Sequence, residues 1–185
     1  MNKVTIIGAG LAGCEAAWQL SNMGISVDLY EMKPKKYSPA HKYQGFAELV
    51  CSNSLKASRL DSAAGLLKEE MRILGSLIVP CAYETAVAAG GALAVDRTAF
   101  SDLVTEKIKS KDNINIIYDE LKEIPDGNVI IATGPLTSDA LADSISEICG
   151  SYLSFFDAAA PIVSFESLDK NLVFFASRYG RGDDD

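Results

Sequence analysis

The stretch VTIIGAGLAG, residues 4–13, decides the fold of this chain. Its first four residues are apolar or β-branched, which is typical of a buried strand in a parallel sheet. Three glycines then follow at GxGxxG spacing: Gly8, Gly10 and Gly13. In a dinucleotide-binding unit the first allows a tight turn, the second lets the backbone approach a pyrophosphate, and the third lets helix and strand pack closely. The stretch therefore predicts the first strand and phosphate loop of a Rossmann-like domain.

The next residues complete this predicted unit. Residues 11–24 are good helix formers that end at a glycine, and the start of such a helix offers free N–H groups to phosphates. Residues 25–31 are predicted to form the second strand, and Glu31 ends it where a carboxylate can bind a ribose hydroxyl. An acid there disfavours NADP, because a 2′-phosphate would meet like charge. The motif itself leaves FAD and NAD open. The predicted cofactor-binding residues here are Gly8, Ala9, Gly10, Leu11, Ala12, Gly13 and Glu31.

A second strand of interest lies in GNVIIATGP, residues 127–135. Asn128–Ala132 is predicted to be a strand that stops at Thr133 and Gly134. Beside a dinucleotide site, a Thr-Gly strand end lets the backbone come close to the cofactor. The alternative is a strand followed by an ordinary turn. We add Thr133 and Gly134 to the predicted cofactor-binding residues.

The rest of the chain contains further helix and strand patterns. Residues 62–78 carry an apolar face of Leu67, Met71, Leu74 and Ile78, with Ser62 as the expected N-cap. A second helix follows Asp96 or Thr98, one of which is expected to cap it. Residues 137–150 form a third predicted helix. The remaining predicted strands cover residues 113–121, 151–156, 160–166 and 171–177.

These patterns predict an α/β fold, a Rossmann-like FAD-binding domain with a parallel sheet and helices on both faces. Residues 1–150 would form the dinucleotide-binding region, with an inserted helical segment at about 41–110. Residues 151–185 would begin a second, strand-containing region that is incomplete. We therefore expect the chain to be a truncated piece of a longer protein.

Composition limits the classes of function. The chain has 185 residues, and none of its apolar runs approaches the roughly 18 residues of a membrane span, so we expect no membrane partner. A net charge of −8 argues mildly against nucleic acid as a partner. The four cysteines form no CxxC pair and there is one histidine, which argues against a metal site or a disulfide framework and favours a reducing cytoplasm.

Cys51 is the candidate nucleophile. It lies in FAELVCSNSL, residues 46–55, where Ser52 and Asn53 follow it, and core positions rarely have such polar neighbours. These two residues would donate hydrogen bonds near the thiolate or cap a turn. A packing role for Cys51 stays open on this pattern alone. For the other three cysteines, Cys14, Cys81 and Cys149, packing or no role at all is favoured.

Two charged stretches have two interpretations each. The lysines of residues 33–42 would form a solvated loop or contact an anionic RNA or folate tail. Asp96 and Arg97 would orient a flavin or substrate, or only cap the next helix.

The chain also carries a set of longer motifs: GAGLAG, YEMKP, SPAHK, FAELVCSNSL, GLLKEEM, GGALAVDR, IIATGPLTS, FFDAAAPI and SRYGRG. Together they closely resemble the N-terminal part of the folate- and FAD-dependent tRNA (uracil-5-)-methyltransferases, the small glucose-inhibited division protein family. The resemblance runs through essentially all 185 residues. Since members of that family are considerably longer, this chain resembles less than half of one.

The resemblance implies a function. FAD would be held by residues 8–13 and Glu31, with Thr133 and Gly134 nearby. Methylenetetrahydrofolate would donate the carbon, NAD(P)H would reduce the flavin, and the product would be 5-methyluridine at position 54 in the T-loop of tRNA. Cys51 would be one of two catalytic cysteines, as nucleophile or as its proton-shuttling partner, and the other would lie beyond Asp185. We therefore expect the isolated chain to retain FAD weakly or not at all and to be inactive in methyl transfer.

Several alternatives remain open. The larger tRNA-modifying flavoprotein of the same group shares the start of the glycine motif, but FAELVCSNSL and GGALAVDR favour the smaller family. A paralogue that methylates ribosomal RNA, an FAD- or NAD-dependent small-molecule oxidoreductase, and a non-catalytic fragment are the others. The sequence leaves the oligomeric state unknown.

Overall fold

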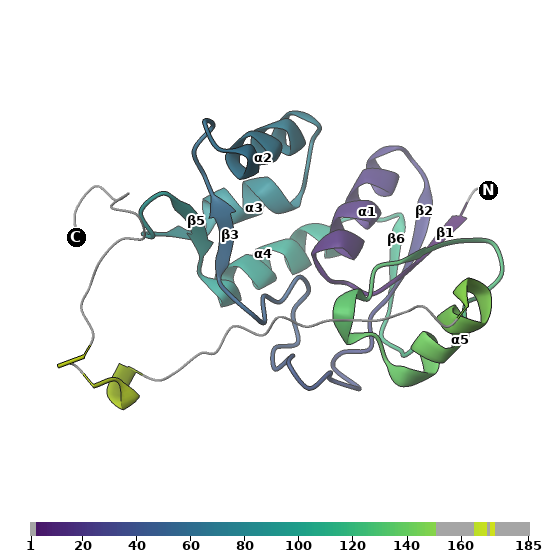
Figure 1. The fold of residues 1–185 in the computed structure, drawn as a ribbon. Coiled ribbons are helices and arrows are strands. Elements are labelled where there is room, and N and C mark those ends of the chain that lie inside the picture. Colours follow the sequence, from purple (N-terminus) through teal and green to yellow (C-terminus); the bar gives the residue numbers. More distant parts are fainter. Residues whose placement is uncertain (1–2, 151–164, 170, 173–185) are drawn as a thin grey trace.

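The computed structural model describes residues 3–150, 165–169 and 171–172 (Figure 1). Its centre is a four-stranded parallel sheet in the order β6-β2-β1-β7. These strands are β1 (Lys3–Ile7), β2 (Ser26–Tyr30), β6 (Ile114–Ile117) and β7 (Asn128–Ile131). The predicted parallel sheet is confirmed, and both motif-bearing strands are adjacent in it, because β1 pairs with β7.

Helix α1 (Leu11–Asn22) connects β1 to β2 and ends where the sequence predicts. Gly24 takes the left-handed φ of +75° just beyond the helix. The N–H groups of Gly24 and Ile25 donate to the carbonyls of Ser21 and Leu20, both at 3.0 Å. This paired pattern satisfies the last helical carbonyls and turns the chain into β2.

The core lies between the sheet and two helices, α1 and α4 (Arg97–Lys109). Ile6, Leu29 and Ile116 are in register on neighbouring strands and so share the face that packs on these helices. Phe100, Val104 and Ile108 form the buried stripe of α4. Further buried members include Cys14, Ala17, Val27 and Ile114.

Helix α5 (Asp139–Cys149) lies on the other side of the parallel sheet from α1 and α4 (Figure 1). Its Leu141 is 2% exposed. The α/β fold with helices on both faces is confirmed. A short 3₁₀ turn, η1 (Gly134–Leu136), connects β7 to this helix region.

Between β2 and β6 the chain forms a second, smaller unit. Its antiparallel sheet has the order β3-β5-β4, from β3 (Ser54–Ala57), β4 (Ala86–Val87) and β5 (Ala92–Val95). Two helices, α2 (Ala63–Ile73) and α3 (Ile78–Glu84), pack beside it (Figure 1). The segment predicted as a helical insertion thus also contains a sheet, and its strand β3, which directly follows the Cys51 loop, was not among the predicted strands.

The single helix predicted over residues 62–78 is wrong. Ser62 caps α2 as expected, accepting a hydrogen bond from the N–H of Gly65 at 3.1 Å. The helix stops at Ile73, because Gly75 takes a φ of +81° and turns the chain. Two members of the predicted apolar face, Leu67 and Leu74, are 56% and 77% exposed.

Polar side chains of α1 hold that turn in place. The Glu15 carboxylate accepts hydrogen bonds from the Ser76 hydroxyl at 2.7 Å and from the N–H groups of Leu77 and Ile78 at the start of α3. The Gln19 amide and the Trp18 indole N–H donate to the carbonyl of Gly75. An acid at a helix N-terminus satisfies donors that the helix itself leaves unpaired. Tertiary contacts with α1 therefore stabilise the break between α2 and α3.

Of the three strands predicted after residue 150, two lie almost wholly outside the described residues. For the third, over 160–166, the structure describes only the end, and Phe165–Ser167 forms a 3₁₀ turn instead of a strand. In the described part of the chain, no helix is long and apolar enough to cross a membrane.

Candidate functional site

The three glycines of the loop after β1 have the geometry that their spacing predicts. Gly8 takes a φ of +99°, and a Cβ atom there would lie 2.8 Å from the carbonyl oxygen of Ala132. A Cβ at Gly13 would lie 1.8 Å from the carbonyl oxygen of Gly8, so only glycine lets α1 approach β1 this closely. At Gly10 the nearest atom would be 3.9 Å away, which leaves open space above the loop.

This open space adjoins the start of α1. Gly10 is the N-cap, no described side chain caps the helix, and its first turn carries no acid. The N–H groups of this first turn and the positive end of the helix dipole therefore face an uncrowded position. A pyrophosphate fits there, because it is anionic, accepts hydrogen bonds and needs close backbone approach.

Glu31 closes the loop from the end of β2. It is 7% exposed, and its carboxylate accepts hydrogen bonds from the N–H of Ala9 at 2.9 Å and from the N–H of Lys33 at 3.0 Å. Each bond uses a different oxygen, and a carboxylate has about four acceptor positions, so capacity remains for a ribose hydroxyl. Glu31 thus orders the phosphate loop and stays available to a nucleotide.

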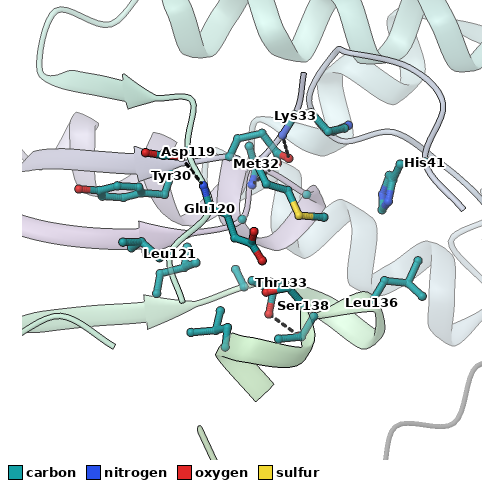
Figure 2. A pocket seen from close by; sticks show the side chains of 18 of the residues that line it. Tyr30, Met32, Lys33, His41, Asp119, Glu120, Leu121, Thr133, Leu136 and Ser138 are labelled. Carbon is teal, nitrogen blue, oxygen red and sulfur yellow. Dashed lines mark hydrogen bonds between the residues drawn. The ribbon is translucent and has the colours of Figure 1, made fainter. Parts of the chain in front are cut away.

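Figure 2 shows the pocket that these residues line. Of the predicted cofactor residues, the lining includes Gly8, Ala9, Gly10, Glu31 and Thr133. Leu11, Ala12, Gly13 and Gly134 belong to the adjoining backbone and do not line it. The remaining walls come from the ends of β1 and β7, from β2 and its loop, from the segment after β6, and from η1 and α5: Ile7, Tyr30, Met32, Lys33, His41, Glu48, Asp119, Glu120, Leu121, Ala132, Leu136, Thr137, Ser138 and Leu141.

The segment 41–48 is fixed to the pocket by a buried lysine. Lys33 is 3% exposed, and its ammonium donates to the carbonyls of Tyr43 and Gly45 at 3.1 and 2.7 Å and pairs with Glu48 at 3.3 Å. Glu48 also accepts from the N–H groups of Lys42 and Tyr43. The N–H of Ala47 donates to the carbonyl of Ala9 in the glycine loop at 2.9 Å. These bonds join the segment to the phosphate loop.

The lysines of residues 33–42 differ in their surroundings: Lys33 is buried, whereas the side chains of Lys35 and Lys36 are 65% and 53% exposed, as a solvated loop would have them. Lys33 has an internal structural role, Lys36 pairs with Glu120 at 2.7 Å, and Lys35 lies 3.8 Å from Asp119. These last two pairs tie the loop after β2 to the segment after β6. Sequence reasoning missed them because the partners are more than 80 residues apart.

His41 lies at one end of the pocket (Figure 2). Its Nδ1 is 2.6 Å from the Ser38 hydroxyl. Burial, reinforced by the Lys33 ammonium, holds the pKa of His41 below its usual value, so the ring is neutral at pH 7. A neutral imidazole can both donate and accept a hydrogen bond at this wall.

Cys51 is exposed and is not among the pocket-lining residues. It follows Glu48 by three residues and precedes β3, so it lies on a loop anchored at both ends. Ser52 and Asn53 anchor that loop: the Ser52 hydroxyl accepts from the N–H of Ser54 at 3.0 Å, and the Asn53 amide donates to the carbonyl of Val95 at 3.2 Å. These contacts favour the interpretation in which Ser52 and Asn53 cap a turn.

Three other candidate residues, Cys14, Cys81 and Asp96, contribute to packing or to a helix cap. Cys14 and Cys81 are fully buried, and burial raises the pKa of both thiols, that of Cys81 to about 11. Asp96 caps α4 by accepting from the N–H of Ala99 at 2.9 Å. Among the described residues, no group of three or more His, Cys, Asp or Glu side chains is arranged to hold a metal ion.

The chain matches known proteins over its whole length. The family model for glucose inhibited division protein A matches residues 3–184. A protein of Acetivibrio thermocellus named methylenetetrahydrofolate–tRNA-(uracil-5-)-methyltransferase TrmFO is 61% identical over 187 residues, which cover 100% of this chain and 43% of that protein. A protein of Geotalea uraniireducens with the same name is 60% identical over a match that covers 99% of this chain and 42% of that protein.

Among solved structures, the GidA-related protein from Thermus thermophilus matches 72% of this chain and 53% of its own chain, with 15% identity and a TM-score of 0.38. This chain spans less than half the length of the curated relatives that it matches. Because the family model covers nearly every residue, the chain belongs to the glucose inhibited division protein A family.

Proposed function

We propose that this chain is the FAD-binding part of a folate-dependent tRNA (uracil-5-)-methyltransferase. One observation carries the proposal: a dinucleotide-type pocket formed by the glycine loop and Glu31 occurs in a chain that is 61% identical to a relative named for this activity. The proposed substrates are uridine 54 in the T-loop of tRNA and methylenetetrahydrofolate, with NAD(P)H as reductant. A cytoplasmic location follows from a tRNA substrate.

In this proposal the residues of the chain bind the cofactor and hold the catalytic segment in place. The backbone N–H groups at the start of α1 hold the pyrophosphate, Glu31 holds the ribose, and the Thr133 strand end lies beside them. Bound FAD, once reduced by NAD(P)H, would supply the hydride that turns the transferred one-carbon unit into a methyl group. The Lys33–Glu48 pair fixes the segment that leads to Cys51.

Cys51 is the proposed catalytic thiol of this chain. C5 of uracil is a poor nucleophile. When a thiolate forms a bond to C6, the C5–C6 π pair becomes available at C5, which then attacks the one-carbon unit. A base removes the C5 proton as the bond between the transferred carbon and the tetrahydrofolate nitrogen breaks. Hydride would then reach the resulting methylene carbon, and the S–C6 bond breaks to return the thiolate. An exposed thiol on an anchored loop suits a macromolecular substrate, either as this nucleophile or as the partner that moves the proton.

A chimera tests this proposal. Residues 1–185 would replace the matched region of the Acetivibrio thermocellus relative, and 5-methyluridine in tRNA would be measured with methylenetetrahydrofolate, FAD and NADH or NADPH. We expect methylation by the chimera, loss of at least a hundredfold in Cys51→Ser, and retention of bound flavin in that variant.

Two outcomes contradict the proposal. Methylation that survives in Cys51→Ser removes this thiol from the reaction. A chimera that binds and reduces flavin but methylates no RNA favours a small-molecule oxidoreductase. The 185-residue chain alone serves as the negative control, because it spans 43% of that relative, and we expect it to form no 5-methyluridine.

A further inference from the structure

Glu120 has no role in the function described above, yet it lies inside the pocket. It belongs to the segment after β6, and Figure 2 shows its carboxylate directed into the cavity between Met32 and Thr133. Its side chain is 16% exposed. A carboxylate in this position either contacts the bound nucleotide or obstructs it, so its chemistry bears directly on which ligand the pocket accepts.

The order of the strands sets which part of a nucleotide reaches Glu120. The carboxyl ends of β1, β2 and β6 follow one another along one edge of the sheet, and they carry the glycine loop, Glu31 and Glu120 in that order. Two inter-strand spacings separate the first from the last, about 10 Å. With the pyrophosphate at the glycine loop and the ribose at Glu31, the base comes next and lies against the segment after β6.

The surroundings of Glu120 suit a purine ring. Met32 and Leu121 also line the pocket and offer apolar contact to a ring. Lys36 pairs with Glu120 at 2.7 Å, so the carboxylate does not add net negative charge against an anionic ligand. Lys36, followed by a hydrogen bond from Ser138, holds the pKa of Glu120 below its usual value. The group is therefore ionised at neutral pH and acts only as a hydrogen-bond acceptor.

We propose that Glu120 is a specificity-determining residue that accepts a hydrogen bond from the exocyclic amino group of the adenine base. This assignment rests on the proposed dinucleotide site and deepens it. An acceptor-only group recognises a base that presents an amino group, and it loses that bond when the amino group is missing. Base recognition in this pocket therefore comes from a side chain that the glycine motif does not predict.

The test compares two probes that differ by one group. Isothermal titration calorimetry would give the affinities of the chimera described above, freed of its flavin and carrying residues 1–185 unmodified, for ADP and for purine riboside 5′-diphosphate, which lacks only the 6-amino group. We expect ADP to bind at least tenfold more tightly, because a hydrogen bond to a charged acceptor contributes more than one to a neutral acceptor. Because both probes carry the same diphosphate and ribose, the ratio of their affinities measures the contribution of the 6-amino group alone.

Three variants test whether the Glu120 carboxylate causes the difference in affinity between the two probes. Glu120→Leu removes the acceptor and should bring the ratio close to one, whereas Glu120→Gln keeps a neutral acceptor and should give an intermediate ratio. Glu123→Gln is the matched control, because Glu123 is an exposed acid on the same segment that does not line the pocket, and its ratio should stay at the unmodified value. Circular dichroism would verify that each variant is folded.

The outcomes separate this proposal from the proposed function. Equal affinities of the two probes for the unmodified chimera, or an unchanged ratio in Glu120→Leu, overturn the assignment of Glu120 and leave the dinucleotide site intact. A flavin-free chimera with unmodified residues 1–185 that binds neither probe overturns both the assignment and the dinucleotide site.

Discussion

Gly10 and Gly13 lie three residues apart and serve opposite purposes. Gly13 is required by packing, because a Cβ there would lie 1.8 Å from the Gly8 carbonyl oxygen. At Gly10 a Cβ would meet only an atom at 3.9 Å, so packing does not require glycine there, and under the proposed function the approach of the ligand does. The two glycines of this motif therefore have different explanations: packing of the fold for Gly13, and the proposed function for Gly10.

We expect Gly13→Ala to lower the free energy of unfolding by about 1–3 kcal/mol or more, the usual cost of overpacking. Gly10→Ala should leave the free energy of unfolding within about 1 kcal/mol, since its φ of −75° suits alanine. It should nevertheless weaken ADP binding at least tenfold, because the added methyl group occupies the approach of the pyrophosphate. Urea unfolding and ADP titration check both variants, and a stable Gly13→Ala would contradict the packing argument.

Lys33 gives a second prediction at this scale. Lys33→Met removes the partner of the Glu48 carboxylate and of two carbonyls in a position that is 3% exposed. Breaking such a buried pair typically costs about 3–5 kcal/mol. Lys42→Met is the matched control, because Lys42 lies on the exposed side of the same segment, and it should change stability by less than about 0.5 kcal/mol. Equal effects of the two substitutions in urea unfolding would mean that the contacts of Lys33 contribute little.

At the scale of elements, α2 shows how a clear helical pattern can mislead. Its apolar residues Leu66, Leu67, Ile73 and Leu74 are all exposed, whereas Gly65 and Lys68 are buried. Gly65 is buried because the Arg59 carbonyl lies where its Cβ would be, and the Lys68 ammonium donates to the carbonyls of Ala57 and Ala64. Periodicity predicted a helix after Ser62 correctly, but neither its end at Ile73 nor the face that it buries.

The exposure of α2 predicts an unusual tolerance to polar substitution. Leu67→Gln and Leu74→Gln should each change the free energy of unfolding by less than about 0.5 kcal/mol, because leucine and glutamine have similar helix propensities and little apolar area is uncovered. Ile108→Ala in α4, at a position that is 0% exposed, should cost about 2–5 kcal/mol. Chemical denaturation of the three variants checks this order, and a cost at Leu67 equal to that at Ile108 would show that its face is covered.

At the scale of the whole molecule, the fold sorts the four cysteines into two classes. Cys51 and Cys149 are exposed, whereas Cys14 and Cys81 are buried. Thiolates react and thiols do not, and burial raises the pKa of the second pair, so these stay protonated at pH 8. We expect two rapid equivalents with Ellman's reagent in the native chain and four after unfolding.

Single substitutions assign these equivalents. Cys51→Ser and Cys149→Ser should each remove one rapid equivalent and leave the other. Four rapid equivalents in the native chain would contradict the burial of Cys14 and Cys81. The measurement needs no cofactor, so it tests the fold independently of the proposed reaction.

Local sequence was sufficient wherever a structure depends on neighbouring residues. The glycine spacing, the stop at Gly24, the Ser62 cap and the strand at Asn128–Ile131 could all be predicted, because turns, caps and strand patterns are governed by contacts within a few positions. The Cys51 loop was correctly singled out as atypical of a core, and its thiol is exposed.

Only the tertiary structure decided the features that join distant segments. The split between α2 and α3 depends on Glu15 and Gln19 of another helix, and the role of Lys33 depends on carbonyls ten and twelve residues away. Glu120 enters the pocket because β6 lies beside β2, with Lys36 as its partner across 84 residues. The sequence by itself determined that this protein has a dinucleotide-type loop. The tertiary structure decided which charged groups surround that loop, because burial and pairing of charges depend on what the folded chain brings within a few ångströms.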